Sequence, residues 1–140
     1  MTKHTPPAEA QKRIVVFRNP EDGWTAAYFL ESREAVRAVE RGLLLPILYP
    51  PFGLGCLEKV WSNSWCQPRH QFVLGFRIGI TTPKLIHLHY SSTRPGHRRQ
   101  GIATLLLNHL CHMFPKARVE FRQPTHEGAK LIADWRKERE

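Results

Sequence analysis

The sequence predicts one mixed α/β (α+β) domain, in which a mainly antiparallel central sheet is flanked by helices. Short apolar or alternating runs typical of strands recur along the 140 residues. Two longer patterns with helical spacing stand in the last third of the chain, on either side of a strand-like run. A hydrophobic content of 41% is enough for one packed core. No stretch approaches the 18 or so apolar residues that a membrane-spanning helix requires.

The first thirty residues predict a polar lead and a hairpin. Residues 1–12 are polar and proline-containing, and we expect them to form a flexible lead to a single domain over 13–140. Residues 14–17 and 24–30 are strand-like runs on either side of the Asn-Pro-Glu-Asp-Gly turn at 19–23. This arrangement is typical of two paired antiparallel strands.

The middle of the chain predicts one helix and a second hairpin. Ser32 is a good capping residue for a helix that continues to about Arg41, before a glycine. After a proline-rich stretch, residues 60–66 and 72–80 have the composition of two strands around the Gln-Pro-Arg-His turn at 67–70.

The last third predicts a strand, a helix, a strand and a helix. Residues 85–90 alternate as a strand with one buried face, and residues 100–113 have helical spacing. Pro115 ends that helix, residues 117–121 alternate again, and 126–139 form the closing helix. We expect the core side of the first helix to comprise Ile102, Leu105, Leu106, Leu110 and Met113.

The junction between the strand and the first of these helices is the most informative part of the sequence. It runs Thr-Arg-Pro-Gly-His-Arg-Arg-Gln-Gly-Ile-Ala-Thr over residues 93–104. The first N–H groups of a helix have no intrahelical partner, so such a junction binds anions. Gly101 allows a diphosphate to approach the backbone, and Arg98 and Arg99 can donate charge-assisted hydrogen bonds to phosphate oxygens.

The pattern Arg98-x-x-Gly101-x-Ala103 resembles motif A of the GNAT superfamily, the acyl-CoA-dependent N-acetyltransferases. Thr93-x-Pro95-x-His97 stands where that family usually has Val-x-Pro-x-Tyr, and the order of elements over 60–135 is similar to the GNAT core. The resemblance implies acetyl-CoA as cofactor, with the loop amides gripping its pyrophosphate. The cofactor-binding residues that it implies are Ser92, Thr93, Arg98, Arg99, Gln100, Gly101, Ile102, Ala103 and Thr104.

Two features depart from the family pattern. The last helix of the family often carries Asn-x-x-Ala-x-x-x-Tyr; Ala129 fits the alanine, but Ala133 stands at the tyrosine that frequently protonates the coenzyme A thiolate. The sequence ends at Glu140, without the family's usual C-terminal strand pair. A sheet edge left uncovered in this way makes a homodimer a reasonable expectation.

The resemblance implies direct attack of an amine on the acetyl thioester, with backbone N–H groups near residues 90–93 as oxyanion donors. Tyr90 is the available proton donor to the leaving thiolate. A histidine titrates near neutrality and can accept the amine proton, and His87 and His89 lie on one strand face. The alternative is that these side chains are ordinary polar surface and that Glu120 pairs with a neighbouring arginine. The candidates for the base are His87, His89, Glu120 and His126.

The cysteines indicate neither a metal site nor a disulfide framework. Cys56, Cys66 and Cys111 have no metal-type spacing and are odd in number. His109 and His112 flank Cys111 without the i, i+4 spacing of a helical zinc pair, so a structural cysteine is the simpler interpretation. Reduced thiols and the lack of an apolar signal segment at the start predict a cytoplasmic protein with no membrane association.

The charge balance leaves more than one function open. Lys and Arg total 21 against 12 acidic residues, a net charge of +9, which attracts polyanions such as coenzyme A. The leading hypothesis is acetyl transfer to an amine on a protein, a small molecule or a charged tRNA. One alternative is a catalytically inactive GNAT-like protein that binds a protein partner. Another is a basic nucleic-acid-binding module that uses the arginine turn and the aromatic residues Trp61, Trp65 and Phe72.

Overall fold

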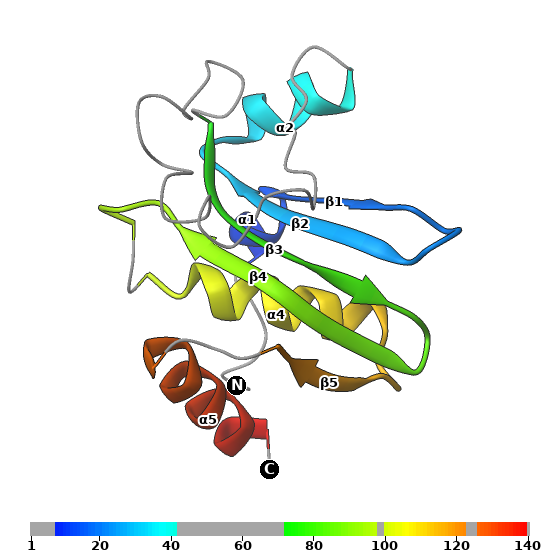
Figure 1. Cartoon of the computed structure of the whole chain (residues 1–140). Coiled ribbons are helices and arrows are strands. Elements are labelled where there is room, and N and C mark those ends of the chain that lie inside the picture. The colour runs from blue at the N-terminus through cyan, green and yellow to red at the C-terminus, as the bar shows by residue number, and fades with distance from the viewer. Residues whose placement is uncertain (1–7, 42–71, 98–99, 123–125, 140) are drawn as a thin grey trace.

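The computed structural model describes residues 8–41, 72–97, 100–122 and 126–139 (Figure 1). They form a mixed α+β fold with a mostly antiparallel sheet flanked by helices, which confirms the predicted class. The elements in chain order are α1 (Ala8–Gln11), β1 (Ile14–Arg18), β2 (Trp24–Leu30), α2 (Arg33–Glu40), β3 (Val73–Thr81), β4 (Leu85–Thr93), α4 (Ile102–Met113), β5 (Arg118–Phe121) and α5 (His126–Arg139).

The five strands of the described sheet lie in the order β1-β2-β3-β4-β5. The pairings from β1 to β4 are antiparallel, and β5 pairs with β4 in parallel after the crossover through α4. The predicted hairpin at 14–30 is confirmed. Its turn is fixed by Asp22, whose Oδ1 accepts a hydrogen bond from Trp24 N at 2.9 Å, and by Gly23 at φ +78°. A Cβ at Gly23 would lie 2.9 Å from the carbonyl oxygen of Thr81.

One face of the sheet is covered by α4, and α2 packs at the end of the other face. In Figure 1, α4 runs behind β3 and β4, and α2 lies beyond the upper end of β2. The larger core lies between the sheet and α4; its buried residues are Ala27, Phe29, Leu74, Ile86, Leu88, Ile102, Leu106, Leu107, Leu110 and Trp135. The second core lies on the other face with α2; its buried residues are Tyr28, Leu30, Ala35, Val39, Phe72, Val73, Phe76 and Ile78.

The buried face of α4 differs from the prediction at one residue. Leu107 is buried, whereas Met113, expected in the core, is 42% exposed. Met113 is the last residue of the helix, where the chain turns away toward Pro115. The helix therefore presents Ile102, Leu106 and Leu110 to the sheet as predicted, with Leu107 in place of the terminal methionine.

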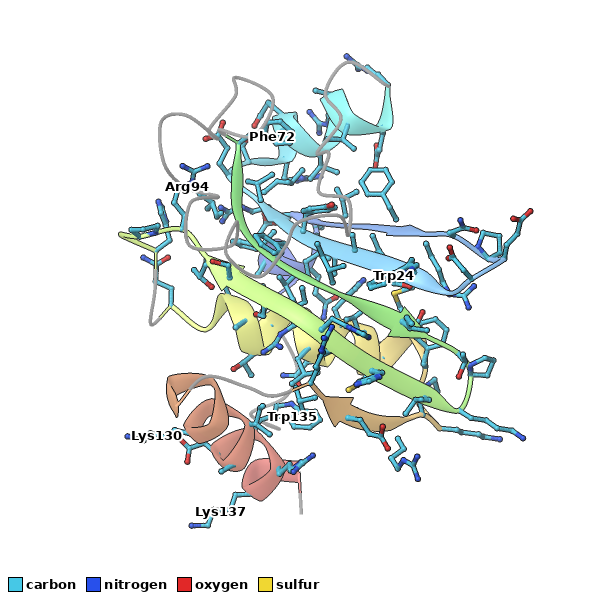
Figure 2. All side chains as sticks on the ribbon, in the orientation of Figure 1. Trp24, Phe72, Arg94, Lys130, Trp135 and Lys137 are labelled. Atoms are coloured by element: carbon cyan, nitrogen blue, oxygen red, sulfur yellow. The ribbon has the colours of Figure 1, made fainter. Side chains whose placement is uncertain are left out.

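Helix ends and contacts follow ordinary capping and packing chemistry. Ser32 Oγ accepts a hydrogen bond from Ala35 N at 3.1 Å, as predicted for the start of α2. Trp135 of α5 points toward α4, as Figure 2 shows, and its Nε1 donates to Asn108 Oδ1 at 2.8 Å. This bond satisfies the indole N–H and fixes α5 against α4.

Two further outcomes concern the chain ends and the middle segment. The helix α1 occupies residues 8–11, within the segment expected as a polar lead. The predicted strand over 60–66 and the turn at 67–70 lie outside the described residues. Within the described part of the chain, none of the helices is both long and apolar enough to cross a bilayer.

Candidate functional site

The connection from β4 to α4 leaves the sheet at a fixed place. Arg94 follows the last residue of β4; its backbone N donates to Leu74 O at 2.8 Å and its side-chain Nε donates to Val73 O at 3.0 Å. His97 N then donates to Arg94 O at 3.0 Å, which closes a turn around Gly96 at φ +92°. The start of the loop is thus held against β3 by both main-chain and side-chain bonds.

Gly101 begins the helix that follows. It stands at the N-cap position of α4 with φ +79° and ψ 13°, a left-handed conformation that favours glycine. Its carbonyl accepts the first helical bond, from Leu105 N at 2.8 Å, and no side chain caps this end. A Cβ at Gly101 would meet nothing within 4 Å. The glycine is exposed, and no side chain caps the N–H groups of the first turn, which is the kind of helix end that binds anions.

The residues predicted to bind a cofactor are distributed around this junction. Ser92 and Thr93 are half-buried at the end of β4, and Gln100 is exposed just before the helix. Ile102 is buried in the core, so only its backbone is available, while Ala103 and Thr104 are half-buried. Arg98 and Arg99 lie outside the described residues.

A bulge interrupts β4 just before the junction. Tyr90 pairs with Ile78 on β3, but the next pair joins Leu88 to Gly79, so that His89 is an extra residue in β4. On the other side, the β5 pairing ends at Leu88 and Phe121, and β4 continues to Thr93. The segment expected to supply oxyanion donors, residues 90–93, therefore follows the bulge and lies beyond the last pair with β5.

A row of side chains crosses the sheet at the level of His87. Trp24 pairs with Ile80, Ile80 pairs with His87, and His87 pairs with Glu120. Paired residues share a face of a sheet, so the row lies on the face opposite α4. The ring centroids of His87 and His89 are 4.6 Å apart, and those of His89 and Trp24 are 5.1 Å apart. The prediction that the two histidines share a face is confirmed.

The surroundings of His89 favour its neutral form. Burial, the neighbouring His87 and the Arg122 guanidinium all lower the pKa of His89 below its ordinary value of 6.5, with burial the largest cause. Arg122 Nη1 lies 3.5 Å from His89 Nδ1. The imidazole of His89 is therefore held uncharged at neutral pH.

The other predicted catalytic residues differ in what surrounds them. Glu120 forms an ion pair with Arg118 at 2.8 Å, one of the pairings that the sequence left open. Tyr90 directly follows the bulge. His126 begins α5 and is far from the row in sequence, and its side chain, like that of Tyr90, lies outside the described part of the chain.

The histidines and the cysteine of α4 form no metal centre. Cys111 is half-buried and packs against the larger core. Burial, with a smaller effect of His112, lowers the pKa of His109. Among the described residues, no group of three or more metal-ligating side chains comes together. The structural interpretation of Cys111 agrees with its packing.

Three residues near the site were not singled out by sequence. Trp24 and Arg122 contact His89, and Arg77 on β3 reaches the first turn of α4. Each is brought there by strand register, which joins segments distant in the chain. An arginine in the apolar run Val-Leu-Gly-Phe-Arg-Ile-Gly-Ile was the one signal in the sequence that could have drawn attention.

Comparison with known proteins gives one match. A family model described as ESCO1/2 acetyl-transferase matches residues 92–140, which are 49 of the 140 residues. The matched segment begins in the last two residues of β4 and contains the β4–α4 junction, α4, β5 and α5. No curated protein and no solved structure matched the chain. The C-terminal third is therefore similar to an acetyltransferase domain, and this similarity supports acetyl transfer in general.

Proposed function

We propose that this protein is an acyl-CoA-dependent N-acetyltransferase of the GNAT type, which transfers acetyl from acetyl-CoA to an amine by direct attack. The main support for this proposal is the strand–turn–helix unit at β4–α4. In this unit a glycine in left-handed conformation begins a helix whose N-terminus is not capped by a side chain. The turn and the helix of this unit, with the last two residues of β4, lie inside the segment that is similar to an acetyltransferase family.

The residues at this junction suit a diphosphate. The N–H groups of Ile102, Ala103 and Thr104 belong to the first turn, where the helix dipole adds partial positive charge. The open space at Gly101 admits phosphate oxygens close to the backbone. Arg98 and Arg99 would add charge-assisted hydrogen bonds. Acetyl-CoA, when bound, supplies an acetyl group activated as a thioester.

The face of the sheet that carries His87 supplies the proton chemistry. We assign His87 as the group that takes the proton from the acceptor ammonium. His87 is half-buried in the row, whereas the Nε2 atom of His89 is buried and its Nδ1 lies beside Arg122. Glu120 is the register partner of His87, and its carboxylate pairs with Arg118 at 2.8 Å.

The remaining steps use the end of β4. Backbone N–H groups between Tyr90 and Thr93 would donate to the thioester oxygen as negative charge develops on it, an interaction commonly worth about 3–4 kcal/mol. Tyr90 would return a proton to the leaving thiolate. The neutral His89, beside His87, keeps a second positive charge away from the group that must become protonated.

Calorimetric titration with acetyl-CoA, and with free coenzyme A alongside, tests the cofactor site. We expect micromolar binding by the natural sequence and none detectable for Gly101→Glu, because the substitution puts bulk and negative charge where phosphate would lie. Gly101→Ala is the matched control, because it carries the same backbone strain at φ +79° without the charge. Equal affinities of Gly101→Glu and Gly101→Ala would refute the assignment of the phosphate site.

Release of free thiol from acetyl-CoA in the presence of amine acceptors tests turnover. The acceptor panel includes lysine-containing peptides, small polyamines and charged tRNA. Binding of coenzyme A without turnover on any acceptor would favour an inactive protein that binds a partner. Affinity for RNA that falls steeply with salt, without coenzyme A binding, would favour a nucleic-acid-binding module.

A further inference from the structure

A buried arginine lies beneath the first turn of α4. Arg77 is in the middle of β3, paired with Ala27 on one side and Ser91 on the other. It is only 4% exposed, although arginine is almost never buried to this degree without a partner. Its side chain lies on the α4 face of the sheet, where Nε donates to Ala103 O at 2.8 Å.

The bond from Arg77 and a close contact at Gly75 fix the position of this first turn. Gly75 lies two residues before Arg77 on the same face, and a Cβ there would be 2.7 Å from Ile102 Cγ2. The glycine lets Ile102 approach the strand, and the arginine bonds the next residue of the helix. The N and O atoms of one residue are roughly 3.5 Å apart, so Arg77 Nε lies within about 6 Å of the Ala103 N–H.

The charge of Arg77 has the same sign as the helix end beside it. Among the described residues, the carboxylates that form ion pairs are Glu9 with Lys12 and Glu120 with Arg118, and neither pair involves Arg77. Burial lowers the pKa of Arg77 to about 10, and the nearby Cys111 partly opposes this shift, so Arg77 still carries its charge at neutral pH. A buried charge is screened less than one in water, and its repulsion by the N-terminus of α4 would be relieved by an anion at that terminus.

We propose that Arg77 is a positioning residue of the cofactor site, which holds the first turn of α4 from within the core and adds a buried positive charge to the diphosphate site. The inference rests on the proposed function, since it assigns a residue to the same cofactor site. It also extends the proposed site from the first turn of α4 into the interior of the domain.

The test compares charge with hydrogen bonding at position 77. Arg77→Lys keeps the charge, and Arg77→Gln keeps an N–H donor without the charge. Arg13→Gln is the matched control, because Arg13 Nε also donates to a backbone carbonyl, that of Leu30 at 2.9 Å, at the start of β1. The measurements are the Kd for coenzyme A and, by competition, for inorganic pyrophosphate, together with the thermal midpoint of each variant.

We expect Arg77→Gln to bind both ligands at least about 10-fold more weakly, Arg77→Lys to stay within about 3-fold, and Arg13→Gln to bind normally. If Arg77→Gln fails to fold, Arg77→Lys serves as the test. A loss of affinity of 10-fold or more in Arg77→Lys, despite the retained charge, would overturn the inference. Equal affinity of folded Gln and Lys variants would also overturn it and leave the proposed function standing. Absence of coenzyme A binding by the natural sequence would overturn the proposed function and this inference together.

Discussion

The two faces of the sheet differ in the kind of interaction that dominates each of them. On the α4 face, backbone geometry prevails: Gly75 admits Ile102, Arg77 bonds a helix carbonyl, and Gly101 opens the helix. On the opposite face, near the bulge of β4, titratable and aromatic side chains gather instead, with His87 and His89 at the centre. Under the proposed function, the difference teaches that holding an anion and moving a proton place different demands on a fold. The first needs a rigid, closely packed backbone, and the second needs side chains in a controlled environment.

The largest expected effect is a loss of kcat without a loss of cofactor affinity when His87 is replaced. His87→Gln should lower kcat by about 100-fold or more, because it removes the proton acceptor, while the Kd for coenzyme A stays within about 2-fold. Measurement of initial rates and of cofactor binding on the same preparation checks this. His112→Gln, at an exposed position on α4, is the matched control.

Equal losses in kcat and in cofactor affinity for His87→Gln would contradict the division between the faces. A larger loss of kcat in His89→Gln than in His87→Gln would indicate that His89, the bulged residue, is the proton acceptor.

The second effect probes the packing on the α4 face. Gly75→Ala should lower the free energy of unfolding by about 1–3 kcal/mol, because the added methyl group would lie 2.7 Å from Ile102 Cγ2. Chemical denaturation of Gly75→Ala, Ile102→Ala and the double variant forms a cycle that isolates this contact. We expect the double variant to be more stable than the sum of the single effects indicates. Simple additivity would mean that Ile102 does not limit the space at Gly75.

The smallest effect is a dependence of stability on pH. The pKa values of His89 and His109 are lowered in the folded protein, so between those values and 6.5 the unfolded chain binds more protons. The free energy of unfolding should therefore decrease as pH falls below about 6.5 and show no contribution from these groups above it. Denaturation curves from pH 7.5 to 5 check this for His89→Gln and His109→Gln, which should flatten the slope. An unchanged slope in both variants would show that neither imidazole is protected from protonation.

The sequence by itself determined the local elements and the junction between β4 and α4. Strand and helix periods depend on neighbouring residues, and the hairpin turn, the Ser32 cap and the glycine that opens α4 are local chemistry, so all of these could be predicted. Even locally, the prediction for one helix end was wrong, because Met113 is the last residue of α4 and is exposed where the chain turns away toward Pro115.

Only the tertiary structure decided which residues from distant parts of the chain come together. The bulge at His89, the contacts of Trp24 and Arg122 with that ring, and the bond from Arg77 to Ala103 all follow from strand register. Register is set by the packing of whole strands against their neighbours, and a shift of one residue would send each of these side chains to the other face. The sequence therefore determined where a glycine opens α4, and the sheet decided which charges and rings come together on its two faces.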